Sequence, residues 1–216
     1  MIGITVSVGY ADKLRQTLLT WQKGLDLVYV ITDDNDNDTA EVAEVIEAVT
    51  HRTSVFYDNG ATFNKGGAMD ELIKFFPVME YSGWVCVFDA DILPPVNWHE
   101  CMSTLEVGNL YGAPRYQDGV KYIPDPPYEM PGYFWIFHTD DPHLPHNPTF
   151  TSWKHAGNYD TVFKDNWPAE KRVKLPLRLN HIGQPGRNWW GIGNEGKMKD
   201  MYMERAIKRG YEHERV

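Results

Sequence analysis

The sequence predicts an α/β fold in which a mostly parallel sheet is covered by helices on both faces. Strand-like and helix-like segments alternate through about the first 95 residues, the order that βαβ units produce. Residues 84–88 are apolar without a break, as expected for a strand buried on both faces of a parallel sheet. The chain of 216 residues is long enough for one well-filled domain, and we find no internal repeat.

Apolar spacing and capping residues define the elements of the first half. Leu14, Leu18 and Trp21 recur at helical spacing. Asp38 and Glu41 fit a capping box that opens a second helix. The expected strands are 2–8, 25–32, 53–57 and 83–88, and the expected helices are 11–23, 38–49 and 64–76.

The second half is less regular, and we expect it to be the smaller part of a single domain spanning residues 1–216, with the division near residue 95. Long loops in a compact domain are often functional. The expected elements are helices 98–107, 160–167 and 195–209, strands 110–115 and 132–137, an extended segment 173–180, and loops 117–131 and 138–154.

The composition argues against two classes of partner. The formal net charge is −9 and the pI is near 5.3, which disfavours general binding to nucleic acids and to anionic membranes. No apolar run is long enough for a transmembrane segment, and the first residues lack the features of a signal peptide. Cys86 and Cys101 do not predict a disulfide framework, so we expect reduced thiols and a cytoplasmic protein.

Two carboxylates follow the apolar strand, one residue apart. Because side chains alternate along a strand, Asp89 and Asp91 should point to the same side. Two acids at the end of a buried strand repel each other and lose hydration, and a divalent cation is the usual remedy. Ligands of open α/β sheets also bind beyond the carboxyl ends of the strands. The alternative is that both acids only cap turns in the loop.

With these elements in place, the chain resembles the GT-A fold glycosyltransferases, especially inverting family two and the related galactosyltransferase C-terminal region. The resemblance covers most of the chain, and it rests on short motifs at the ends of strands and the starts of helices. These motifs are Val8-Gly9-Tyr10, the acidic turn 33–38, Asn64-Lys65-Gly66-Gly67, Asp89-Ala90-Asp91, Gly157-Asn158-Tyr159-Asp160, and His181 within 179–183. In the acidic turn, the Gly and Ser of the family pattern are replaced.

The resemblance implies a nucleoside-diphosphate sugar, most simply a UDP-sugar, as donor, and a Mn²⁺ or Mg²⁺ ion as cofactor. Asp91 would bind the metal directly, and Asp89 would contact the ribose or a metal-bound water beside Ala90. His181 would add a nitrogen ligand, which suits manganese better than magnesium. A structural histidine is the simpler alternative for His181.

Asp160 occupies the position of the family's general base. A carboxylate that takes the proton of an attacking hydroxyl accelerates transfer, and attack from the face opposite the leaving group inverts the anomeric centre. The acceptor would be a carbohydrate or another hydroxyl compound. The alternative role for Asp160 is to cap the helix that begins there, and the two roles are compatible.

The resemblance also assigns the nucleotide contacts. Asp34 would accept the imide N–H of uracil, Asn64 and Lys65 would approach the base or the phosphates, and Tyr10 would stack on the base. Arg187 and Trp190 lie between glycines, which is typical of a mobile lid that closes over the diphosphate. Surface charges and core packing are the alternatives.

Three other functions remain open from the sequence. Asp89 and Asp91 also match a haloacid-dehalogenase-type phosphatase, although that motif normally follows the first strand and three strands are expected before it here. A nucleotidyltransferase is expected to carry a Gly-rich basic signature after the first strand, which this sequence lacks. A non-catalytic module that binds nucleotide sugars or carbohydrates explains the aromatic content but not the placement of Asp160.

Overall fold

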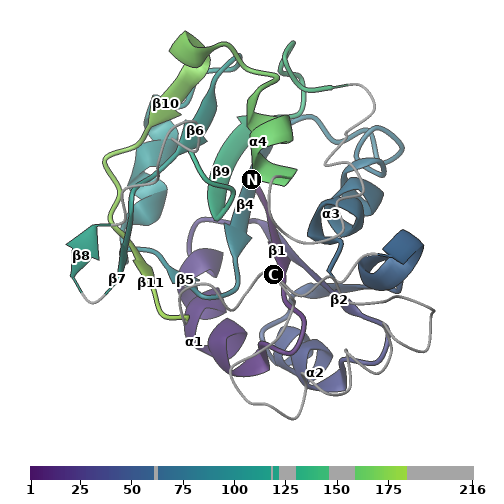
Figure 1. Cartoon of the computed structure of the whole chain (residues 1–216). Coiled ribbons are helices and arrows are strands. Elements are labelled where there is room, and N and C mark those ends of the chain that lie inside the picture. Colours follow the sequence, from purple (N-terminus) through teal and green to yellow (C-terminus); the bar gives the residue numbers. More distant parts are fainter. Residues whose placement is uncertain (61–62, 118, 122–129, 146–158, 184–216) are drawn as a thin grey trace.

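The computed structural model describes residues 1–60, 63–117, 119–121, 130–145 and 159–183 (Figure 1). A seven-stranded sheet has the order β10-β6-β9-β4-β1-β2-β3, and four of its six strand pairs are parallel. The predicted α/β class is therefore confirmed. The strands of this sheet are β1 Ile2–Val6, β2 Leu27–Asp33, β3 Val49–Thr53, β4 Trp84–Asp89, β6 Leu110–Gly112, β9 Phe134–His138 and β10 Arg172–Lys174.

A smaller four-stranded sheet lies beside the main one, in the order β5-β11-β7-β8. Its strands are β5 Ile92–Leu93, β7 Arg115–Gln117, β8 Val120–Lys121 and β11 Leu179–His181. The helices are α1 Ala11–Gln22, α2 Asn37–Val45, α3 Lys65–Ile73 and α4 Tyr159–Lys164, with 3₁₀ helices η1 Val55–Gly60, η2 Trp98–Thr104 and η3 Ala169–Lys171. Among these described elements, no helix combines the length and apolar composition that a membrane span needs.

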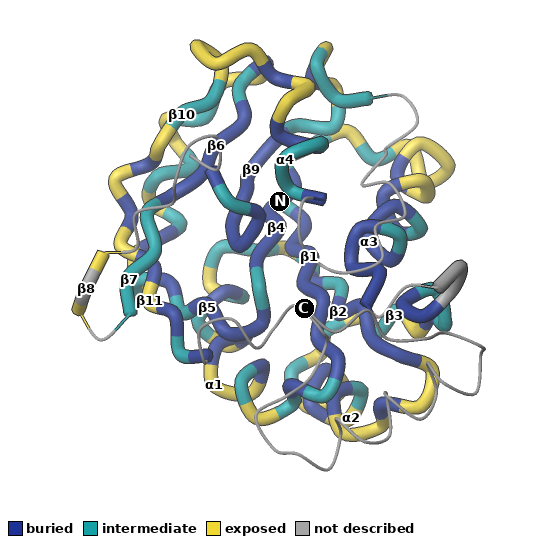
Figure 2. Tube along the Cα trace, viewed as in Figure 1, coloured by how far each residue is buried: buried dark blue, intermediate teal, exposed yellow. Residues whose placement is uncertain are grey.

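Helices cover both faces of the main sheet, and the central strands are buried (Figure 2). Successive residues of β4 alternate between two apolar clusters: Val85 and Val87 pack in the cluster that includes α3 and α4, whereas Cys86 and Phe88 pack in the cluster that includes α1 and α2. This alternation is the reason why β4 has no polar residue before Asp89.

The chain crosses over between β1 and β4. β2 and β3 follow on one side of β1, and β4 then pairs with the other side, with Val6 opposite Asp89. In open parallel sheets, ligands bind beyond the carboxyl ends of the strands at such a point of reversal. The residues after β1 and the two aspartates at the end of β4 therefore share the edge where a ligand is expected.

The predicted boundaries of α2 and of the third strand are wrong. The cap is Asp36, not Asp38, since the Asp36 side chain accepts the Thr39 N–H at 3.1 Å. The helix ends at Val45 because Glu47 adopts a left-handed conformation, with a φ of 57°, in a Schellman motif. That position usually holds glycine, so no stop signal marks the helix end in the sequence. The strand follows at once as β3, and most of the segment expected as a strand forms η1.

Candidate functional site

The turn that carries Asp89 and Asp91 is anchored at three successive carbonyl groups. The carbonyl oxygen of Ala90 accepts from Thr17 Oγ1 at 2.8 Å, and that of Ile92 accepts from Trp21 Nε1 at 2.8 Å. The carbonyl oxygen of Asp91 accepts from the N–H of Ile182 at 2.9 Å. Helix α1 and the residue after β11 therefore fix the backbone from which both carboxylates project.

The Thr17 anchor predicts a measurable loss of stability. The variant Thr17→Val keeps the shape of the side chain but leaves the buried carbonyl of Ala90 without its donor, so we expect the free energy of unfolding to fall by about 1–3 kcal/mol. Urea denaturation checks this. Thr20→Val on the same helix is the matched control, because among the described contacts its hydroxyl donates nothing to the turn. Equal losses for the two variants would contradict the anchoring role.

Asp91 and His181 meet at the end of the turn. Their side chains are buried, and Asp91 Oδ2 lies 3.1 Å from His181 Nε2 across 90 residues of sequence. The pairing of β11 with β5, which sets His181 opposite Ile92, brings them together. Gln117 on β7 contacts the other side of the imidazole, at 3.2 Å from Nδ1.

Asp89 points elsewhere, toward Lys65 at the start of α3. The Lys65 ammonium group forms an ion pair with Asp89 Oδ1 and lies 5.0 Å from the centroid of the Tyr159 ring. Burial alone would lower the pKa of Lys65, but Asp89 and Tyr159 outweigh it and raise that pKa. Burial raises the pKa of Asp89, and Asp91 adds to that effect, while Lys65 and Arg115 oppose it. Lys65 and Asp89 therefore each stabilise the charged form of the other in this largely buried pair.

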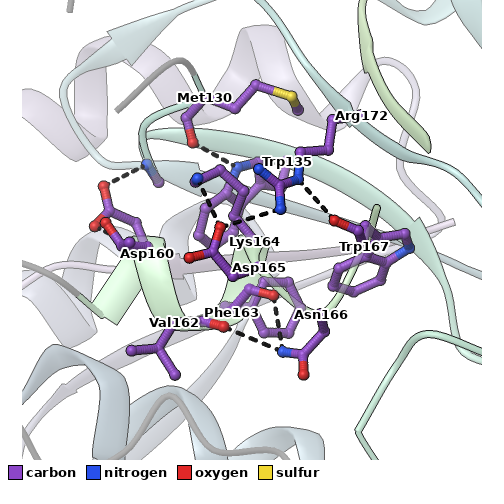
Figure 3. A network of polar contacts seen from close by, with 12 residues as sticks. Met130, Trp135, Asp160, Val162, Phe163, Lys164, Asp165, Asn166, Trp167 and Arg172 are labelled. Carbon is purple, nitrogen blue, oxygen red and sulfur yellow. Dashed lines mark hydrogen bonds and ion pairs between the residues drawn. The ribbon is translucent and has the colours of Figure 1, made fainter. Parts of the chain in front are cut away.

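Asp160 lies in the first turn of α4 and is partly exposed (Figure 3). Its Oδ2 accepts from the N–H of Gly132 at 3.1 Å, and its Oδ1 accepts from the N–H of Thr161 at 2.9 Å. Tyr159 beside it donates to the carbonyl oxygen of Gly132 at 2.7 Å. These contacts hold the Asp160 carboxylate beside Gly132, which lies just before β9. The neighbouring Tyr159 ring also contacts the Lys65 ammonium group.

The loop after β1, which the sequence places at the nucleotide, is held by a backbone contact. Val8 and Tyr10 are buried, and Gly9 has a φ of 65°. The N–H of Gly9 donates to Asp36 Oδ2 at 2.7 Å, so the acidic turn after β2 holds the loop after β1. The burial of Tyr10 favours its packing alternative.

Two other predicted nucleotide contacts differ in how they are held. Asn64 caps α3 by accepting the N–H of Gly67 at 2.8 Å. Asp34 is exposed, and Arg52 donates to its carbonyl oxygen at 2.7 Å, so the carboxylate stays at the surface. Ala90 is buried between the two aspartates. Arg187 and Trp190 lie outside the described residues.

Sequence reasoning missed Gln117 and Arg115, and it gave no role to Gly183 and Tyr159, which stand within the quoted motifs. An added Cβ on Gly183 would overlap Asp91 Oδ2 and lie 2.9 Å from His181 Nε2, so only glycine leaves this space open.

Arg115 stacks over the Tyr133 ring at 4.8 Å and adds positive charge near Asp89. Strand β7, which carries Arg115 and Gln117, was expected only in part, and no motif marks it.

Asp91 and His181 fit a divalent cation as neighbouring ligands. Ligands about 2.1 Å from an octahedral ion and at right angles are about 3 Å apart, close to the 3.1 Å between Oδ2 and Nε2. Among the described residues, no group of three or more His, Cys, Asp or Glu side chains could hold a metal ion. Two protein ligands still suffice where substrate phosphates and water complete the shell, as is usual for magnesium.

No protein-family model matches the sequence, and no curated protein matches it. Several solved structures share its fold. The inositol-1-phosphate CTP transferase from T. maritima has a TM-score of 0.53 at 10% identity and covers 98% of both chains. A glucosyl-3-phosphoglycerate synthase from Mycobacterium tuberculosis, in complex with Mn²⁺ and UDP, has a TM-score of 0.55 at 12% identity over 99% of this chain and 81% of that chain.

A mycobacterial protein has a TM-score of 0.56 at 12% identity over 99% of this chain and 76% of that chain. Identities this low establish the fold and not the activity. The described sheet order, the helices on both faces and these likenesses agree: the chain has a GT-A-like fold, with a mostly parallel Rossmann-like central sheet.

Proposed function

We propose that this chain is a metal-dependent glycosyltransferase that moves a sugar from a nucleoside-diphosphate sugar to an acceptor hydroxyl. The contact between Asp91 and His181 carries the proposal. It forms beside the chain crossover of the main sheet, where two buried side chains with metal-ligand chemistry meet. The fold is shared with a synthase solved with Mn²⁺ and UDP, which supports a uridine nucleotide as the donor.

In this proposal, residues 1–95 bind the donor nucleotide and residues 96–216 bind the acceptor. Asp91 and His181 would hold the cation, which when bound stabilises the negative charge that builds on the leaving diphosphate. Asp89, which is held by Lys65, would contact the ribose or a metal-bound water. Lys65 would approach the base or the phosphates, and its pairing with Asp89, which raises the pKa of Lys65, supports a protonated amine there.

Asp160 takes the proton of the acceptor hydroxyl in this proposal. The hydroxyl oxygen bonds to the anomeric carbon, the bond from that carbon to the diphosphate breaks, and the configuration inverts. The two backbone N–H groups that donate to Asp160 keep its carboxylate in one orientation. The predicted roles of Arg187 and Trp190 at the diphosphate stay part of the proposal.

One measurement tests the donor side. Mn²⁺ and UDP added together are expected to raise the melting temperature more than either alone, by about 5–10 °C at ligand concentrations about 100-fold above Kd. Thermal unfolding with each common nucleoside diphosphate gives the comparison, and Asp91→Asn is the control that should lose the joint effect. The absence of any shift with all of them would argue strongly against the transferase.

A nucleotidyltransferase is the second candidate, because the fold likeness to the CTP transferase covers nearly all of both chains. The two activities leave different products. A glycosyltransferase releases a nucleoside diphosphate from a nucleotide sugar. A nucleotidyltransferase releases pyrophosphate from a nucleoside triphosphate when a sugar phosphate attacks its α-phosphorus. A screen of both substrate sets with Mn²⁺ decides between them.

Hydrolysis of a phosphomonoester that is lost in Asp89→Asn would instead favour the phosphatase.

A further inference from the structure

The Gln117 side chain contacts both His181 and Gly183, which lies two residues further along the chain. Its Oε1 lies 3.2 Å from His181 Nδ1, and its Nε2 donates to the carbonyl oxygen of Gly183 at 3.3 Å. Strands β7 and β11 are parallel, with Tyr116 opposite Asn180, so the register of the sheet sets Gln117 beside His181. The contact is thus a consequence of the fold.

The contact to Gly183 fixes the orientation of the amide. A backbone carbonyl oxygen only accepts hydrogen bonds, so the NH₂ group of Gln117 faces Gly183 and its oxygen faces the imidazole. An amide oxygen also only accepts, and therefore Nδ1 of His181 must carry a hydrogen. When the imidazole is neutral, Nε2 then presents a lone pair toward Asp91 Oδ2, 3.1 Å away.

We propose that Gln117 is a positioning residue that holds a hydrogen on Nδ1 of His181 and so keeps Nε2 available to a divalent cation shared with Asp91. This inference rests on the proposed metal-dependent function. Without the Gln117 oxygen, a neutral imidazole gains by moving its hydrogen to Nε2, where the Asp91 carboxylate accepts it. A hydrogen in that place excludes a cation, which explains why a metal-bound histidine usually donates through its other nitrogen.

Gly183 supports the same role from the opposite side. A Cβ there would overlap Asp91 Oδ2 and lie 2.9 Å from His181 Nε2, so the chain leaves space where these two ligand atoms face each other. The Gly183 carbonyl that orients Gln117 belongs to the same residue. A single glycine therefore keeps the ligand pair accessible and also orients the amide that sets the hydrogen position.

Binding of Mn²⁺ alone gives the first test, measured by electron paramagnetic resonance of the free ion without nucleotide. Gln117→Leu is expected to weaken binding about 10- to 100-fold. Gln117→Glu keeps an oxygen that accepts from Nδ1 and should retain most of the affinity. Gln16→Leu, at an exposed position of α1, is the matched control and should bind as the wild type does. An unchanged Mn²⁺ affinity in Gln117→Leu overturns the proposal.

The position of the hydrogen gives a second test that needs no metal. In ¹⁵N-histidine-labelled protein, under conditions in which the ¹⁵N shifts show the His181 imidazole to be neutral, the wild type should show a protonated Nδ1 at His181. In Gln117→Leu this nitrogen should lose its hydrogen to Nε2, an effect that a purely structural role would not produce. His181→Gln assigns the signal.

The two tests separate the two ways in which the proposal can fail. An unprotonated Nδ1 in the wild type overturns the role of Gln117 whatever the reaction is. A wild-type protein that binds no Mn²⁺ but shows the expected shift of the hydrogen on Gln117→Leu contradicts the proposed metal-dependent function, while the effect of Gln117 on His181 stands.

Discussion

Replacing Asp160 by Asn is expected to lower turnover by about 100- to 10,000-fold, the range of a lost general base, and to leave donor binding unchanged. The Asn side chain keeps an oxygen that accepts from the N–H of Gly132, so the start of α4 should hold its position. Turnover with a saturating nucleotide sugar, together with calorimetric titration of Mn²⁺ and UDP, separates the two effects.

Asp165→Asn is the matched control for this experiment. Asp165 directly follows α4 and pairs with Lys164 at 2.8 Å and with Arg172 at 3.1 Å, at the opposite end of the helix from Asp160 (Figure 3). Its loss should leave turnover nearly unchanged, because Asp165 lies at the far end of α4 from Asp160 and its contacts are with Lys164 and Arg172. If Asp160→Asn turns over at the wild-type rate, another group takes the proton.

Replacing Lys65 by Met is expected to reduce the free energy of unfolding by about 3–5 kcal/mol, because removing one partner of a buried ion pair strands the other charge. The side chains of Lys65 and Asp89 are 9% and 24% exposed, so water screens the remaining carboxylate only partly. Chemical denaturation measures the loss. Lys164→Met is the matched control: it also removes a buried cation, but its partner Asp165 is 51% exposed, and the cost should be smaller.

The pH dependence of Lys65→Met has a definite sign. Without Lys65, burial and Asp91 raise the pKa of Asp89 further, so the folded variant binds more protons than the unfolded chain does. Its free energy of unfolding therefore rises, relative to that of the wild type, as the pH falls toward the ordinary Asp value of 3.8. A stability gap between the two proteins that does not narrow on acidification contradicts the assignment.

The double variant Lys65→Met with Asp89→Leu completes the cycle. Removing both charges leaves no stranded carboxylate, so the double variant should be more stable than Lys65→Met alone. Losses that simply add would show that the two side chains do not depend on each other, contrary to the ion pair.

Local signals were sufficient for the central strand, because an unbroken apolar run depends only on neighbouring residues. They did not predict that Asp89 turns to Lys65 while Asp91 turns to His181, because β4 ends at Asp89 and its alternation does not reach Asp91. The meeting of Asp91 with His181 was expected from the resemblance alone, since 90 residues separate them and no periodicity joins them. The role of Gln117 was missed because it depends on the register between β7 and β11, two three-residue strands.

Two further differences depend on how the chain packs. The end of α2 was misplaced because Glu47 takes the left-handed position in which glycine is the usual signal. The surface alternative for Lys65 is wrong, because Lys65 is buried against Asp89, a contact that arises only once α3 packs beside the end of β4. Its contact with the nucleotide stays a prediction. In both cases the packed structure overrides the local preference of the residue.

The anchoring of the Asp89–Asp91 turn by α1 also bears on how such a protein diverges. Two of its three carbonyl anchors come from side chains 71 and 73 residues earlier in the chain. Substitutions at positions 17 and 21 are therefore constrained by the turn. A related protein that loses one of these two donors needs a compensating change in the turn. Among related sequences, we therefore expect positions 17 and 21 to covary with the residues that flank the two acids.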